Sequence, residues 1–386
     1  MFLRALCGDK TGNLYPFTVY LVAGWKPAIP GIITMNKTTL FFGLFSAFLL
    51  IPIVSEAQTR TKKQVEELIA AEGSKAPDWW SEVKLDYPAT LNLDFPDGPP
   101  DGGWDNQRKV GCYVWDIINP NPHRWRSGIK LFHTLLQRHK DDVPKRTQVM
   151  NDLGSMYFRF EQDYARAAFW WEKSGDVQRF PGMSAQLAEC YWKLGNKQMA
   201  LDALKNQRLS LPQIKLLGDM GETDQALKLC ESIVRSNPLI ANFYAGDICR
   251  VAGRNKEALA FYQKAVDAPK GQDRDEPFRV RAIANIAGLK AFELLDLKKV
   301  PDGTYKNDSM GYEGPIHVAV TVKLGRIEDV RVTDHHEKQF YSSITDTIRQ
   351  IKEKQGVKGV DATSGATMTS EAIINATAKA LVEAMK

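Results

Sequence analysis

The residues best suited to chemistry lie near the carboxyl end of the chain, where residues 361–370 read DATSGATMTS. Gly365 and Ala366 leave the backbone uncovered, so a bulky ligand can approach it closely. The helical pattern SEAIINATAKALVEAM (370–385) follows at once, and free amides at a helix N-terminus favour an anion such as a phosphate. Asp361 can orient a hydroxyl or help to hold a cation. Hydroxyls are supplied by Thr363, Ser364, Thr367 and Thr369.

A structural interpretation of the same residues stays open. A Ser/Thr-rich turn with a helix cap has a similar composition, and Thr369 or Ser370 can cap the helix that follows. A Gly-Ala-Thr string taken alone favours this plainer interpretation. The elements around the string must therefore decide between the two.

Strands are expected upstream of the string. Residues 316–322 read IHVAVTV and residues 327–332 read IEDVRV, with Gly325 in the short connection between them. Alternation of apolar and polar residues around a glycine-containing turn predicts a half-buried β-hairpin. In the helix that follows, one apolar stripe is formed by Ile373, Ala376, Ala380, Leu381 and Ala384. We therefore expect a compact α+β domain over residues 301–386.

This tail resembles the FMN-binding domain family, which also occurs in subunits of sodium-pumping quinone reductases and Rnf-type electron-transfer complexes. The resemblance is specific because the order and spacing of several motifs match. The matching residues are Asp302-Gly303-x-Tyr305, Gly311-Tyr312-x-Gly314-Pro315, the turn at Gly325, His335-x-Glu337 and Ser364-Gly365-Ala366-Thr367.

The resemblance implies a covalent flavin. In such domains a separate flavin transferase joins the threonine that ends Ser-Gly-Ala-Thr to FMN through a phosphoester, which makes Thr367 the attachment residue here. The implied cofactor-binding set is Thr367, Asp361, Ser364, Gly365, Ala366, Thr369 and Tyr312. Tyr312 can stack on the isoalloxazine ring, which carries the redox chemistry itself. No catalytic residue is implied, since the Thr367 hydroxyl serves as an anchor.

The histidines give no metal site on sequence grounds. His335, His336 and Glu337 lack a standard ligand spacing, so a solvated loop is the favoured interpretation and a contact near the flavin the second. His123, His133 and His139 are read as surface or packing residues. Phe340 and Tyr341 are expected in the core.

Repeats occupy the middle of the chain. LGNKQMALDAL (194–204), MGETDQALKLC (220–230) and AGRNKEALAFY (252–262) align without gaps, and resemble the tetratricopeptide repeat. Their shared glycines fit a turn between two helices, and their shared alanines fit a close helix crossing. Such an array has a concave face for partners and no chemistry of its own. The fold class predicted is a multidomain chain, with an all-α tetratricopeptide-like solenoid followed by a small α+β FMN-binding domain.

The start of the chain predicts export. Residues 35–57 have a lysine, an apolar run shorter than a membrane span, and a small-residue cleavage site, as in a signal peptide. We interpret residues 1–34 as a non-native upstream extension. The expected divisions are 1–34, the signal peptide 35–57, a Trp/Pro-rich capping region 58–144, repeats 145–268, a linker and capping helix 269–300, and the FMN-binding domain 301–386.

Composition and cysteines narrow the classes of function. The chain has 386 residues with a net charge of +5 spread through mixed-sign segments, which gives no case for nucleic-acid binding. Five cysteines exclude a disulfide scaffold, and we expect the four beyond residue 57 to be buried apolar side chains, with a Cys230–Cys249 bridge left open. The tryptophans between 79 and 192 fit an anchored capping segment better than a platform for sugars.

Three functions remain open at this point. The first is an exported periplasmic or extracytoplasmic flavoprotein, in which repeats dock a redox partner, at the membrane or in solution, and FMN on Thr367 relays electrons. The second is a flavin-dependent reductase of a small extracytoplasmic acceptor. The third is a repeat scaffold whose tail binds FMN without a covalent bond.

Overall fold

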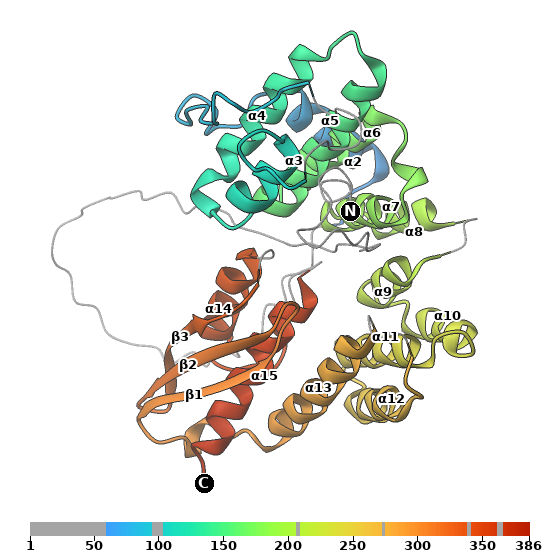
Figure 1. Ribbon diagram of the computed structural model, residues 1–386. Helices are drawn as coiled ribbons and strands as arrows, with labels where there is room; N and C mark the ends of the chain where they lie inside the picture. The colour runs from blue at the N-terminus through green and yellow to red at the C-terminus, as the bar shows by residue number, and fades with distance from the viewer. Residues whose placement is uncertain (1–58, 95–102, 206–208, 272–274, 338–340, 361–365) are drawn as a thin grey trace, which may run out of the picture.

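The computed structural model describes residues 59–94, 103–205, 209–271, 275–337, 341–360 and 366–386. Helices form an array that runs down one side of the molecule, and the only sheet of the described residues lies beside the end of that array (Figure 1). The expected segments 1–34 and 35–57 lie outside the described residues. No helix in the described ranges has the length and apolar character needed to cross a membrane.

The first part of the chain forms an irregular helical cap. It contains α2 (Lys62–Ser74), α3 (Val110–Tyr113), the π-helix η1 (Val114–Ile118), η2 (Pro122–Arg124) and α4 (Trp125–Arg138). Trp125 stacks on Phe160 with ring centroids 5.1 Å apart, and Trp171 is fully buried. The indole of Trp104 donates a hydrogen bond to Asp116. Of these contacts, the stack of Trp125 on Phe160 joins the cap to the first repeat helices.

The array that follows is a series of helix pairs. Its helices are α5 (Val143–Met156), η3 (Tyr157–Glu161), α6 (Tyr164–Ser174), η4 (Val177–Arg179), α7 (Pro181–Lys193), α8 (Lys197–Leu204), α9 (Leu211–Asp219), α10 (Thr223–Val234), α11 (Pro238–Val251) and α12 (Asn255–Asp267). The three repeat glycines lie at the turns between paired helices. Gly195, Gly221 and Gly253 have φ values of 97°, 86° and 72°, a backbone conformation that favours glycine. The three repeat alanines are fully buried. The predicted solenoid is confirmed.

A long helix, α13 (Glu276–Leu294), joins the array to the carboxyl-terminal domain, and is followed by η6 (Leu297–Lys299). It packs against α12 on one side and α15 on the other. The approach to α15 is close, because a Cβ at Gly288 would lie 1.9 Å from the Asn375 side-chain oxygen. The array and the carboxyl-terminal domain therefore share one interface.

The carboxyl-terminal domain is a three-stranded antiparallel sheet with helices on one face. β1 (Gly303–Met310), β2 (Pro315–Lys323) and β3 (Arg326–Asp334) lie in the order β1-β2-β3, and the register pairs Val318 with Val332 and Val320 with Val330. α14 (Tyr341–Lys354) packs on β3, and α15 (Thr367–Glu383) covers β1 and β2. The predicted α+β domain is confirmed, and β1 and α14 are elements that the sequence analysis did not identify.

The cysteines of the array are buried thiols. Cys190, Cys230 and Cys249 are free, so the bridge that we left open between Cys230 and Cys249 is not formed. Burial raises the pKa of the Cys230 thiol to about 12, which keeps it protonated. Their expected role as small apolar side chains agrees with this.

Candidate functional site

Thr367 is the first residue of α15, the helix that covers the sheet. Ala366 stands at the N-cap position and makes no side-chain capping bond, and the first regular helical bond runs from the Ser370 amide to the Ala366 carbonyl. Our expectation that Thr369 or Ser370 caps this helix is wrong, because the helix begins before both. Asp361, Ser364 and Gly365 lie outside the described residues.

The Thr367 hydroxyl is open to a reaction partner. Its side chain is partly exposed, and within the described parts of the chain no group forms a hydrogen bond with it. The positive end of a 17-residue helix lies at the same place. An anionic group joined to this hydroxyl would meet amides that no side chain caps.

Thr369 has a different environment. It is fully buried, and its hydroxyl donates a hydrogen bond of 2.7 Å to Glu337 Oε2. Ser370 is also buried and accepts a hydrogen bond from Thr347 on α14. The two hydroxyls that follow Thr367 in the sequence therefore point into the protein, whereas Thr367 does not.

Glu337 links three parts of the site. Its Oε1 atom accepts hydrogen bonds from the backbone amides of Tyr312 (2.8 Å) and Glu313 (3.0 Å), while Oε2 accepts the one from Thr369. The residue is 2% exposed, and burial raises the pKa of its carboxyl although all three bonds act to lower it. We expected a solvated loop here, and for Glu337 this is wrong, because the carboxylate fastens the β1–β2 turn to the start of α15.

Glycine is required where that turn meets the carboxylate. A Cβ at Gly311 would lie 2.6 Å from Glu337 Oε1 and 2.7 Å from Ile316 Cδ1. The Gly311 amide closes the turn with a bond of 2.7 Å to the Gly314 carbonyl. The Glu337 carboxylate therefore bridges the backbone of Tyr312 and the first turn of α15.

Arg281 of α13 holds the same turn from the other side. Its Nε donates to the Gly311 carbonyl (3.1 Å), and its Nη2 donates to the Tyr312 carbonyl (2.7 Å). The guanidinium carbon lies 5.3 Å from the centroid of the Tyr312 ring. Arg281 could not be identified from the sequence, because no local pattern shows that α13 reaches the β1–β2 turn.

The neighbouring histidines do not form a metal centre with described residues. No group of three or more potential ligands gathers anywhere in the described ranges. His335 is partly buried, which lowers the pKa of its imidazole, and His336 is exposed and lies beside Gly314. Of the two, His336 borders the β1–β2 turn.

The residues present suit a flavin mononucleotide. For the phosphate end they supply a hydroxyl to which no described residue is hydrogen-bonded, at a helix start whose N-cap residue makes no side-chain bond, and for the ring a tyrosine on a turn held from both sides. Apolar walls alone would not fix such an anionic phosphate group, so the helix start is the feature that matters.

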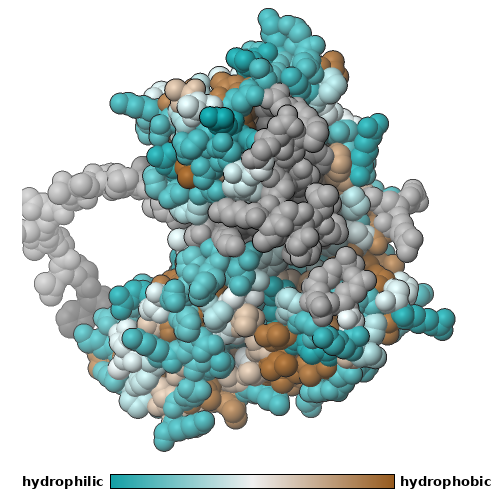
Figure 2. All heavy atoms as spheres, viewed as in Figure 1, coloured by the Kyte–Doolittle hydropathy of each residue, from teal (hydrophilic) through white to brown (hydrophobic). Residues whose placement is uncertain are grey.

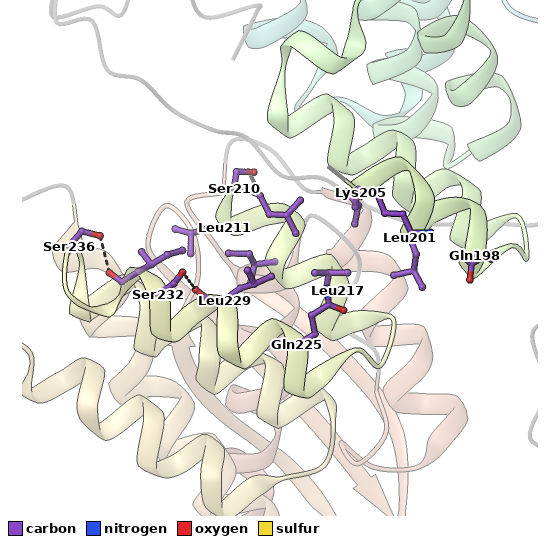
Figure 3. A pocket seen from close by; sticks show the side chains of 14 residues that line it. Gln198, Leu201, Lys205, Ser210, Leu211, Leu217, Gln225, Leu229, Ser232 and Ser236 are labelled. Atoms are coloured by element: carbon purple, nitrogen blue, oxygen red, sulfur yellow. Dashed lines mark hydrogen bonds between the residues drawn. The ribbon is translucent and has the colours of Figure 1, made fainter. Parts of the chain in front are cut away.

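A separate hollow lies within the array. A groove of about 780 Å³ is lined mainly by aliphatic side chains of α8, α9 and α10, with serine and glutamine side chains among them (Figure 3). It lies between α8 on one side and α9 and α10 on the other. It contains none of the residues of the carboxyl-terminal site, and no described segment lies over it in a way that identifies an occupant.

Comparison with known proteins agrees with this division of the chain. A model of the FMN-binding domain matches residues 311–382, and a tetratricopeptide repeat model matches residues 211–273. An uncharacterized protein of Treponema pallidum (strain Nichols) is 38% identical over 85 residues, which are 22% of this chain. The match spans 23% of the length of that relative. The chain therefore carries a carboxyl-terminal FMN-binding domain, preceded by tetratricopeptide repeats.

Proposed function

We propose that this protein is an exported electron carrier whose FMN is joined to Thr367 through a phosphoester. The observation that carries the proposal is the placement of Thr367 at the start of α15 inside an FMN-binding domain, with no hydrogen bond from its hydroxyl to any described residue. Thr369 and Ser370 are engaged inside the protein and are poor alternatives. A separate flavin transferase would form the bond, as in the FMN-binding domains that this tail resembles.

Export gives covalent attachment a purpose. A dissociable flavin would be lost once the protein left the compartment in which flavins are made, whereas a phosphoester retains it. The signal-peptide pattern of residues 35–57 supports this location. The mature protein would then begin near residue 58 and remain in the periplasm or an equivalent compartment, free or docked at a membrane.

Tetratricopeptide repeats support protein contacts, and we propose that they dock the redox partner. The face of α13 that neither α12 nor α15 covers exposes Val280 and Ile283, which lie on either side of Arg281 in the sequence. Figure 2 shows apolar atoms gathered over the region that α13 occupies in Figure 1. A partner on this face would be near the flavin site.

Attachment is tested by expressing the export-competent chain with a flavin transferase and measuring the intact mass. Wild type should gain the mass of FMN less one water, and Thr367→Ala should gain nothing. Thr333→Ala, which removes an exposed hydroxyl on β3, is the matched control and should be loaded fully. Loading of Thr367→Ala would refute the attachment site, and in that case Thr369→Val shows whether the neighbouring hydroxyl is used.

A further inference from the structure

The residue that completes the flavin site lies outside the domain that the family model matches. Arg281 belongs to α13, and the match begins at Gly311. Its side chain nevertheless ends at the β1–β2 turn, and the residue is 5% exposed. A buried arginine is costly unless its donors are used, and here they are used on the backbone carbonyls of Gly311 and Tyr312.

Tyr312 is held at both ends of its backbone unit. Its amide donates to Glu337, and its carbonyl accepts from Arg281. These partners come from the loop after β3 and from α13, so the turn is clamped between two separate elements. These two contacts restrict the backbone of Tyr312, and so they restrict the direction in which its side chain leaves the turn.

The ring itself also contacts the guanidinium. Arg281 Cζ lies 5.3 Å from the centroids of both Tyr312 and Phe278, so the cation lies between two aromatic rings. No carboxylate among the described residues forms an ion pair with Arg281. Its positive charge is therefore satisfied by carbonyl oxygens and ring faces, and its planar shape fixes their relative orientation.

We propose that Arg281 is a positioning residue of the flavin site, which orients the Tyr312 ring against the flavin and makes α13 part of that site. This inference rests on the proposed function, because it assigns the ring a flavin to contact. It means that α13, the helix between the array and the carboxyl-terminal domain, completes the site rather than merely leading to it. Lysine cannot replace arginine fully, since an ammonium group lacks the fork that reaches two carbonyls at once.

The first test uses protein without flavin. In a Thr367→Ala background, hydrogen exchange of the amides at residues 311–314 should be at least tenfold faster in Arg281→Met, and intermediate in Arg281→Lys. Arg279→Met is the matched control, since Arg279 lies on the same helix but bonds to the carbonyls of Ala265, Val266 and Ala268. It should leave exchange in this turn unchanged. Exchange in Arg281→Met equal to that of the control would overturn the proposal.

The second test uses loaded protein. A tyrosine stacked on a flavin quenches its fluorescence, so Arg281→Met and Tyr312→Leu should each raise the flavin emission several-fold, and the double variant should add nothing further. The intact mass of Arg281→Met should still include FMN. Emission that changes in Tyr312→Leu but not in Arg281→Met would refute the positioning role. Absence of FMN from wild type would refute the proposed function instead, while the exchange test would still decide how the turn is held.

If Arg281→Met fails to fold, Arg281→Lys and Arg281→Gln carry the same two measurements. Exchange in the β2–β3 strands serves as the internal reference for folding. The proposal is supported if exchange becomes faster only at residues 311–314 and its rate rises in the order arginine, lysine, glutamine at position 281. Uniformly faster exchange across the whole sheet contradicts it, because Arg281 would then be a general stabilising residue.

Discussion

At the scale of single residues, the site depends on a glycine, Gly311, that lets the Glu337 carboxylate approach the backbone of the β1–β2 turn. Glu337 Oε1 reaches two amides of the β1–β2 turn because Gly311 has no side chain in its way. The same carboxylate holds Thr369 in the first turn of α15. The position of Thr367 is thus set by bonds that Thr367 itself does not make.

Gly311→Ala should therefore weaken both the fold and the site. The new methyl group would lie 2.6 Å from Glu337 Oε1, so either the turn or the carboxylate must move, and we expect a loss of about 1–3 kcal/mol in the free energy of unfolding. Chemical denaturation measures the loss, and intact mass should show less FMN incorporated. Gly356→Ala is the control, because a Cβ there meets nothing within 4 Å. Equal stability of the two variants would contradict the role assigned to Gly311.

A second residue, His133, should make the free energy of unfolding depend on pH. Burial lowers the pKa of its imidazole to about 4, and the positive charge of Arg166 acts in the same direction. The unfolded chain binds a proton at this residue near pH 6.5, so stability falls as the pH falls from about 6.5 towards 4. At pH 5 the loss from this residue is about 2 kcal/mol.

Denaturation of wild type and His133→Gln at pH 7 and pH 5 isolates that contribution. The variant should lose less stability on acidification, although it is less stable at pH 7 because the contact of His133 Nε2 with the Tyr157 hydroxyl is changed. His123→Gln alters an exposed histidine and should keep the wild-type dependence. Equal pH dependence in His133→Gln and wild type would show that His133 takes up its proton in the folded state as readily as in the unfolded chain.

At the scale of elements, the repeats depend on small residues at helix crossings. Ala258 of α12 is fully buried where this helix packs on α11, and a Cβ at Gly246 of α11 would lie 2.5 Å from the Tyr262 ring. Ala258→Leu should therefore cost about 1–3 kcal/mol by overpacking. Ala260→Leu makes the same change at an exposed position of the same helix and should be close to neutral. Thermal unfolding distinguishes the two, and a neutral Ala258→Leu would argue against close packing of this pair.

The elements differ in how far the sequence could predict them. Gly195, Gly221 and Gly253 were identifiable because a turn with positive φ restricts the residue type, and the β2–β3 hairpin because its valines alternate. Strand β1 was not identified, since its inward positions include Asn307 and Ser309 and its pattern carries no apolar period. Contacts between distant segments, such as Arg281 with the Tyr312 carbonyl, depend on how helices pack and leave no local pattern.

At the scale of the whole molecule, charged groups join the array to the flavin domain. Arg250 of α11 forms a buried ion pair with Glu371 of α15, and Asn285 of α13 donates a hydrogen bond of 2.9 Å to the same carboxylate. Asn375 in turn donates to the Asn285 side-chain oxygen at 2.8 Å. Glu371 lies one turn after Thr367, so the array fixes the start of α15 directly. We expect the two parts to unfold together as one cooperative unit.

Arg250→Met tests this coupling, because it leaves Glu371 buried without its cation. Loss of one partner of a buried pair costs about 3–5 kcal/mol, and the loss should appear as an earlier transition of the carboxyl-terminal domain, separate from that of the array. Combining it with Glu371→Gln removes the stranded charge, keeps an acceptor for Asn285, and should restore much of the stability and the single transition. Arg254→Met, at the N-cap position of α12, removes solvent-exposed pairs with Asp224 and Glu257 and should leave the curve near that of wild type. Two transitions already present in the wild type, or no recovery in the double variant, would mean that the array and the flavin domain are held together by the apolar contacts of α13 alone.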